Sequence, residues 1–151
     1  KAYLVTPTEV ARRAAARAMG WPPIDPAVRT VGVDVEDHRV IAHKRYARLA
    51  PAAARAEGGE LLALLDERGL LLAELPLLRA TRDAPDGAPI DRALHVDVTA
   101  FPQLALGPAW ARASGDPAAA ARLADQPVRV LSETAGTRAG RHVYLGPRSA
   151  P

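Results

Sequence analysis

Two neighbouring runs of alternating side chains, at residues 31–35 and 39–49, constrain the fold of this chain more than any other feature. In the first run, valines at every second position enclose small or polar residues: Val31, Val33 and Val35 enclose Gly32 and Asp34. This is the period of a half-buried strand. The second run follows Glu36-Asp37-His38, a polar stretch typical of a turn. We therefore expect Val31–Val35 and Arg39–Leu49 to pair as an antiparallel hairpin.

The second run places charged and phenolic side chains on one face of its strand. Because side chains alternate along a strand, Lys44, Tyr46 and Arg48 share a face, whereas Arg45 lies on the opposite one. A face that simply lies in water would explain this arrangement for a single strand. The pattern therefore needs support from elsewhere in the chain.

That support comes from two further copies of the pattern. Lys-x-Tyr with a proline shortly after it occurs at Lys1-Ala-Tyr3 as well as at Lys44-Arg-Tyr46. A weaker copy, His142-Val-Tyr144, closes the chain. Lysine supplies a point charge with three donors, and tyrosine supplies a hydroxyl donor on a rigid ring. Strands about 4.8 Å apart can bring such groups onto one phosphate or diphosphate. A shared anion site and three solvated faces remain equally good interpretations.

The remaining elements predict an α+β fold. Strands are expected at residues 1–5, 31–35, 39–49, 70–75, 93–99, 128–133 and 142–145, and helices at 6–19, 51–68 and 116–125. Thr6 and Glu9 suit a capping box at the start of the first helix, whose stripe of Val10, Ala14, Ala18 and Met19 would pack on the sheet. Leu70–Leu75 fits a strand or a helix, and the Gly69 and Pro76 that flank it favour a strand. The order predicts a curved antiparallel sheet, a half or partial barrel, with helices on its outer side.

Composition excludes several classes of protein. The 151 residues suit a single domain. The absence of cysteine excludes disulfides and thiolate metal sites, which fits a cytoplasmic protein. No segment approaches the ~20 apolar residues of a membrane span, so we expect no membrane partner. A net charge of +3 does not demand nucleic acid, and 4% aromatic residues are too few for base stacking, so nucleic acid is not an expected partner.

The other reactive side chains give weaker signals. His95 and Asp97 share a strand face and could bind a metal, but a polar surface explains them more simply. The chain has no HExxH motif and no phosphate-binding GxxxxGK[ST] loop. We therefore predict no metal and no cofactor.

The residues of the predicted hairpin resemble those of a known family. The segment Val31–Pro51 is similar to the strand pair of aromatic prenyltransferases of the dimethylallyltryptophan synthase type, in which a strand ends in Lys-x-Tyr with a nearby proline. Lys1-Ala-Tyr3 and Val143-Tyr144-Leu145-Gly-Pro147 resemble two further copies. The resemblance implies a barrel of antiparallel strands ringed by helices. It implies that an allylic diphosphate is bound by Lys1, Tyr3, Lys44, Tyr46 and Tyr144, and that its prenyl group is transferred to an aromatic, indole-like small molecule or peptide.

Three departures from the family pattern shape these expectations. The chain is about half the usual length, His142 stands where a lysine is typical, and the family's acidic acceptor-binding residue lies upstream of the first Lys-x-Tyr. We therefore expect a single domain that is either complete or a fragment of a larger barrel, which a second copy or a partner chain would complete. The alternative function is a non-catalytic α+β module whose basic sheet face binds an acidic partner or a small anion.

Overall fold

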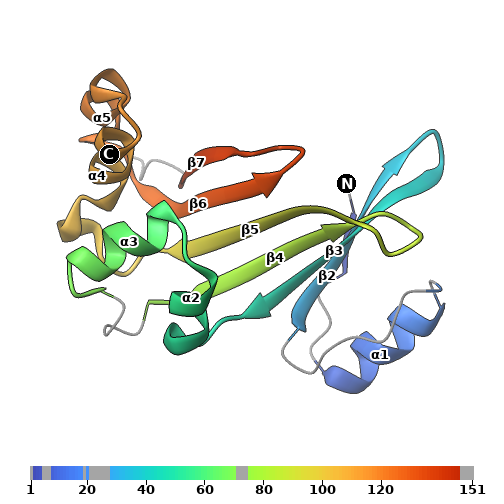
Figure 1. Ribbon diagram of the computed structural model, residues 1–151. Helices are drawn as coiled ribbons and strands as arrows, with labels where there is room; N and C mark the ends of the chain where they lie inside the picture. The colour runs from blue at the N-terminus through green and yellow to red at the C-terminus, as the bar shows by residue number, and fades with distance from the viewer. Residues whose placement is uncertain (1, 5–7, 19, 21–27, 71–74, 147–151) are drawn as a thin grey trace.

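The computed structural model describes residues 2–4, 8–18, 20, 28–70 and 75–146 of the chain. Seven strands form one antiparallel sheet in which they follow each other in chain order. The sheet curls into a half-barrel, with helices on its outer side (Figure 1). The predicted α+β fold with a curved antiparallel sheet is therefore confirmed. The strands are β1 Ala2–Leu4, β2 Val28–Glu36, β3 Arg39–Arg48, β4 Leu77–Asp83, β5 Pro89–Asp97, β6 Val128–Gly136 and β7 Gly140–Leu145.

The first helix lies between β1 and β2, and the other helices lie in the connections that lead from one hairpin to the next. The helices are α1 Glu9–Ala18, α2 Pro51–Glu57, α3 Glu60–Glu67, α4 Leu106–Ala113 and α5 Pro117–Leu123, with a short 3-10 turn at Pro102–Leu104. Hairpins β2–β3, β4–β5 and β6–β7 thus alternate with pairs of helices. None of the described helices is long and apolar enough to span a membrane.

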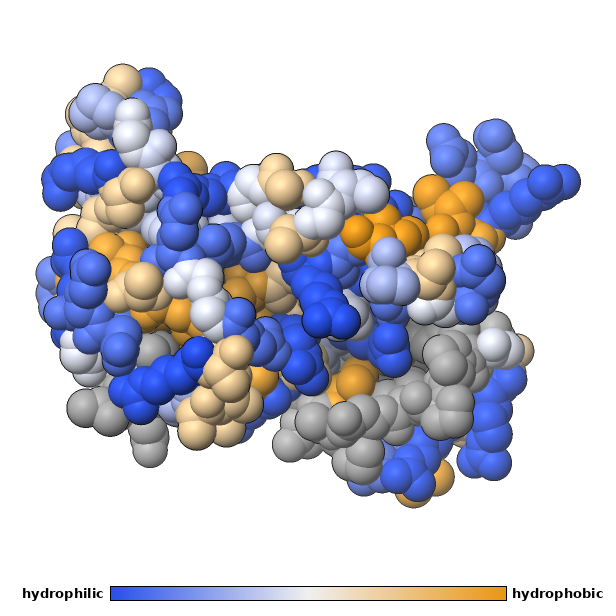
Figure 2. Space-filling view, in the orientation of Figure 1, coloured by the Kyte–Doolittle hydropathy of each residue, from blue (hydrophilic) through white to orange (hydrophobic). Residues whose placement is uncertain are grey.

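The β2–β3 hairpin is present as predicted, and longer than predicted. Asp37 and His38 form its two-residue turn, with φ angles of 48° and 62°. Positive φ at both positions gives the turn the right-handed twist of the strands. Near the turn the hairpin projects beyond the other strands (Figure 1), and it exposes Val35, Val40 and Ile41 by 45%, 41% and 37% (Figure 2).

The outer face of the sheet carries the main hydrophobic core. Leu77, Val96 and Leu131 of the sheet pack against leucines of α3 and Trp110 of α4, all of them buried. Glu133 of β6 also fixes the start of α3, because its carboxylate accepts the backbone N–H groups of Glu60 at 3.2 Å and Leu61 at 2.9 Å. Such a partner satisfies donors that have no acceptor within the helix.

Most of the strand predicted at Leu70–Leu75, residues 71–74, lies outside the described residues. Its two ends are not in a strand, because Leu70 directly follows the turn after α3 and Leu75 is buried outside any strand. Strand β4 begins at Leu77, after Pro76, whose missing N–H makes it a poor ladder residue. The next predicted strand, 93–99, is displaced in the structure to Pro89–Asp97, and helix α4 was not predicted at all.

The prediction for the first helix is also partly wrong. The helix begins at Glu9, and Thr8 caps it by accepting the N–H of Ala11 at 3.2 Å, whereas Thr6, the predicted cap, lies outside the described residues. Val10 is 76% exposed, and Ala14 and Ala18 are exposed as well, so the expected apolar stripe does not pack on the sheet. Met19 lies outside the described residues.

Truncation of a side chain should be far more destabilising in α3 than in α1. Leu65→Ala removes a fully buried side chain and should lower the free energy of unfolding by about 2–5 kcal/mol, because it leaves a cavity. Val10→Ala removes an exposed one and should change it by less than about 0.5 kcal/mol. Urea unfolding of both variants measures this, and equal effects would contradict the placement of α1.

Candidate functional site

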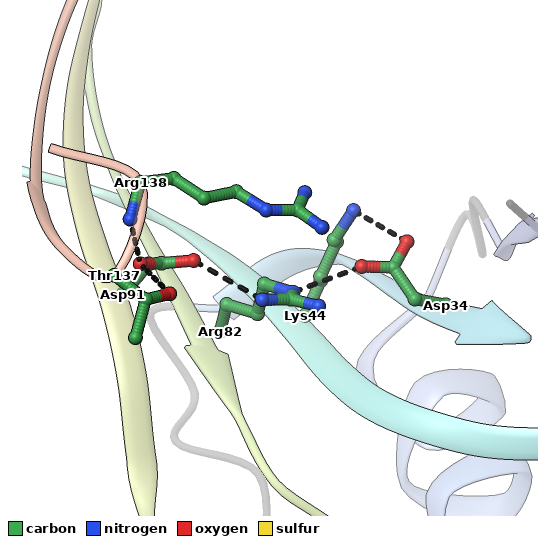
Figure 3. A network of polar contacts seen from close by, with 6 residues as sticks. All are labelled: Asp34, Lys44, Arg82, Asp91, Thr137 and Arg138. Atoms are coloured by element: carbon green, nitrogen blue, oxygen red, sulfur yellow. Dashed lines mark hydrogen bonds and ion pairs between the residues drawn. The ribbon is translucent and has the colours of Figure 1, made fainter. Parts of the chain in front are cut away.

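A buried carboxylate, Asp34 on β2, organises the inner face of the sheet. It accepts a hydrogen bond from Lys44 Nζ of β3 at 2.7 Å and another from Arg82 Nε of β4 at 2.9 Å. Asp34 is 6% exposed and Lys44 is 9% exposed. Adjacent strands supply the two cations, since Lys44 lies directly opposite Arg82 in the β3–β4 ladder. The contacts therefore tie three strands together on one face (Figure 3).

Arg82 extends the network to a second buried carboxylate. Its Nη1 donates to Asp91 Oδ2 at 3.2 Å, while Asp91 Oδ1 accepts the Thr137 hydroxyl and the Arg138 backbone N–H, each at 2.9 Å. Gly136 makes this approach feasible: its φ is 116°, and a Cβ there would lie 2.4 Å from the Ile90 carbonyl oxygen. The β6–β7 turn can therefore fold closely against β5.

The hydrogen bonds keep both carboxyl groups ionised. Burial raises the pKa of Asp34, but the hydrogen bonds and charges of Lys44 and Arg82 outweigh it, and the net pKa is lowered. Burial likewise raises the pKa of Asp91, and the donors from Arg138, Thr137 and Arg82 lower it overall. Both groups therefore act as fixed negative charges near neutral pH.

Arg138 adds a third cation to this region. Its side chain extends from the β6–β7 turn in the direction of Lys44 (Figure 3). Within the described chain, the contact recorded for Arg138 is that of its backbone N–H, and its guanidinium joins neither carboxylate. Lys44, Arg82 and Arg138 with Asp34 and Asp91 give one net positive charge. We call these three basic side chains the cation end of the site.

The cation end opens into a hollow of about 320 Å³ on the inner face. The hollow is lined by Lys44, Tyr46, Ala80, Thr81, Arg82, Asp91, Ala93, His95, Thr134, Arg138, His142 and Tyr144. Ala80 and Ala93 are paired across β4 and β5, and their small side chains leave room between larger neighbours. We call this space the inner hollow.

Aromatic and imidazole rings line the other end of the inner hollow. The ring centroids of Tyr46 and His95 are 6.1 Å apart, and those of His95 and Tyr144 are 6.2 Å apart. His142 continues the row, with its ring 6.4 Å from that of Tyr144. We call this row the ring end. Burial lowers the pKa of His95, and the charge of His142 lowers it further, so His95 is neutral at neutral pH.

A buried hydroxyl lies beside the ring end. Ser132 is directly opposite both His95 on β5 and His142 on β7. Its side chain is fully buried, and its Oγ has no hydrogen-bond partner among the described residues. A buried polar atom without a partner is uncommon in folded proteins.

The structure brings together three of the five residues predicted to bind a ligand: Lys44, Tyr46 and Tyr144 all line the inner hollow. Tyr3 lies opposite Gly32, which in turn lies opposite Lys44, so its position is in the same row of the sheet. Lys1 lies outside the described residues. Arg45 is on the outer face, where it forms an ion pair with Asp83, as the alternation of side chains predicts.

Five further residues of the site were missed by the sequence analysis: Asp34, Arg82, Asp91, His95 and Arg138. Asp34 was recognised only as a strand position, and His95 only as a weak metal candidate. Arg82 was missed because the sequence pattern predicts a strand before Pro76, whereas strand β4, which carries Arg82, lies after it. No group of three or more His, Asp or Glu side chains that could hold a metal occurs among the described residues.

Comparison of the chain with models of protein families, with curated proteins and with solved structures found no match. The resemblance to aromatic prenyltransferases is therefore neither supported nor contradicted by these comparisons.

The lowered pKa values predict how the fold responds to acid. A carboxyl group whose pKa is lower in the folded state stabilises the protein fully above its unfolded pKa of about 3.9, and this contribution disappears as the pH falls through the folded value. Stability should therefore drop as the pH is lowered below about 4. In Asp34→Asn/Asp91→Asn this drop should be smaller, although the variant is less stable at pH 7. Urea titrations at a series of pH values measure it, and parallel curves for both proteins would contradict the network.

Proposed function

We propose that this chain binds an allylic diphosphate in the inner hollow and takes part in the transfer of its prenyl group to an aromatic acceptor, as the resemblance to aromatic prenyltransferases implies. One observation carries the proposal: the hollow has a cation end and a ring end. An allylic diphosphate has the same two parts, an anionic head and a short apolar tail that becomes a cation. A simple anion would use only one end of the site.

The cation end suits a multiply charged head group. The guanidinium of Arg138 is planar and can donate two parallel hydrogen bonds to a phosphate. Lys44 and Arg82 stay in place because Asp34 and Asp91 hold them. A ligand therefore meets positioned donors, which lowers the entropy lost on binding.

The ring end suits the tail. Tyr46 and Tyr144 present rings on either side of His95. Tyrosine faces attract a cation placed within about 6 Å of the ring centroid. A carbocation held against these half-exposed rings would be partly shielded from water, which would otherwise hydrolyse it.

The reaction that fits these two ends is an alkylation. The C–O bond between the allyl group and the diphosphate breaks, and the diphosphate leaves with the electron pair. The allylic carbon then forms a bond to an aromatic carbon of an acceptor such as an indole, which finally loses its proton.

A second candidate function is a non-catalytic module that binds a small anion. It is favoured by the pairing of Lys44 and Arg82 with carboxylates, which leaves only one net positive charge at the cation end. Such a site suits weak, reversible binding. The two candidates differ in whether the ring end contributes to affinity.

The first test concerns the cation end. Arg138→Gln removes a guanidinium that pairs with neither carboxylate and is exposed. It should weaken binding of dimethylallyl diphosphate about tenfold or more, because charge-assisted contacts contribute about 1.5–3 kcal/mol. Stability should change little. Isothermal titration and thermal unfolding measure the two quantities.

Arg92→Gln is the matched control, because Arg92 is an exposed arginine whose position on β5 is on the outer face. It removes the same charge and should leave affinity within about twofold, which corresponds to less than about 0.5 kcal/mol. Equal losses in both variants would mean that only the overall charge attracts the ligand, and the specific site would have to be abandoned.

The second test concerns the ring end. Dimethylallyl diphosphate should bind more tightly than inorganic diphosphate by about tenfold or more, because burying a CH₂ group contributes about 0.8 kcal/mol. At about 100 times its dissociation constant the allylic ligand should add about 2.7 kcal/mol of apparent stability. Tyr144→Ala, at a position that is 49% exposed, should remove most of the difference between the ligands. If the two ligands bind the natural chain equally well, the small-anion module is the better description.

A further inference from the structure

We propose that His95 is the proton acceptor of the inner hollow: its imidazole takes the proton from the aromatic carbon that has gained the prenyl group. This inference rests on the proposed prenyl transfer and assigns the base for that reaction. It is based on the position of His95 and on the hydrogen bonds and ion pairs that engage the other bases of the hollow.

Position is the first argument. His95 lies on β5 in the middle of the ring end, with Tyr46 on one side and Tyr144 on the other. A prenyl cation held by those two rings, and the acceptor carbon that attacks it, would both lie against the imidazole. A base must be within hydrogen-bond reach of the proton that it removes, and His95 is the base flanked by both tyrosines.

The carboxylates are the competing bases, and their contacts make them poor ones. Asp91 lines the hollow, but both of its oxygens are engaged by Arg82, Thr137 and Arg138. Asp34 is engaged by Lys44 and Arg82. Hydrogen bonds to an ionised carboxylate lower its basicity. Both carboxylates also lie beside the cation end, where they pair with Lys44 and Arg82.

Lys44 is held in an ion pair by Asp34, so His142 is the remaining base among the described residues that line the hollow. It adjoins Tyr144 but not Tyr46, and it is exposed. A base in contact with water exchanges its proton freely and offers no protection to the cation. His142 therefore fits the role of a neighbour that influences His95, not that of the acceptor.

The protonation state of His95 agrees with this role. Burial, and then the positive charge of His142, lower its pKa, so that the imidazole is neutral and able to accept a proton near pH 7. The charged or titratable side chains that share its face among the described residues are Asp34 on β2, Lys44, Tyr46 and Arg48 on β3, Arg82 on β4, Asp91 and Asp97 on its own strand, His142 and Tyr144 on β7, and Arg138 of the β6–β7 turn.

The proton transfer completes the reaction without a further reactant. The C–H bond of the alkylated ring carbon breaks, its electron pair restores aromaticity, and the proton goes to an imidazole nitrogen of His95. The imidazolium then releases that proton to water after product leaves.

The test is turnover of dimethylallyl diphosphate with indole, followed by mass spectrometry of the prenylated product. His95→Gln keeps a neutral polar side chain but cannot accept the proton, and it should lower kcat at least about 100-fold, as loss of a general base does. Affinity for inorganic diphosphate should stay within about twofold. His95→Ala should regain turnover when imidazole is added, which a purely structural role would not produce.

His142→Gln provides a second readout through pH. Because the charge of His142 lowers the pKa of His95, its removal should raise that pKa. The acidic limb of the kcat–pH profile should then move to higher pH.

The outcomes separate the inference from the function on which it rests. If the natural chain forms no prenylated product, the proposed function fails and the inference fails with it. If the natural chain is active and His95→Gln retains its kcat, or if His142→Gln is the variant that loses kcat, the function stands and the assignment of His95 is overturned.

Discussion

The inner face of the half-barrel depends on one interaction, the buried carboxylate of Asp34 between Lys44 and Arg82. Removing one member of a buried ion pair typically costs about 3–5 kcal/mol, because the charge that remains is desolvated and uncompensated. The three residues come from three successive strands, so the interaction also fixes the register of β2, β3 and β4. Gly32, opposite Lys44, adds no side chain to the crowded row. Arg82 also pairs with Asp91, and Asp91 in turn accepts the backbone N–H of Arg138 and so positions the β6–β7 turn.

The two faces of the sheet differ in the kind of side chain that they bury. The outer face is covered by helices, so leucines of α3 can pack against Leu77 and Leu131 to form an ordinary hydrophobic core. No described helix covers the inner face, where the polar groups must satisfy one another. The ion pairs do this at one end of the inner hollow, while half-exposed rings occupy the other. Curvature brings the two ends into a single hollow, because it draws β3 and β7 toward the same space.

Local pattern was sufficient to predict the parts of the site that lie on one hairpin. Alternation placed Lys44 and Tyr46 on one face and Arg45 on the other, and the structure confirms this. Arg82 and Asp91 could not be found in the same way, because a leucine-rich segment resembled a strand more strongly than the mixed sequence after Pro76 did. Arg138 lies between two predicted strands, at 128–133 and 142–145, but nothing local indicates that this connection folds against Asp91. The special backbone of Gly136 becomes meaningful only when the neighbouring strand is known. These residues therefore join the site through long-range strand pairing, which sequence periodicity does not predict.

The distribution of pKa values divides the inner hollow by chemistry as well as by shape. At the cation end the carboxyl groups have lowered pKa values, so the charges of the network stay constant across the neutral range. At the ring end, burial lowers the pKa of His95, so its imidazole is neutral and can accept a proton near neutrality. An anionic head group would therefore meet the same charge at any physiological pH, whereas proton transfer beside the rings would be sensitive to it. Within one site, the surroundings of two groups can shift their pKa values in different ways. One group then keeps a constant charge for binding, and the other is free to transfer a proton. For the proposed reaction, the buried network at the cation end would allow the neutral imidazole at the ring end to act independently of the charge that holds the ligand.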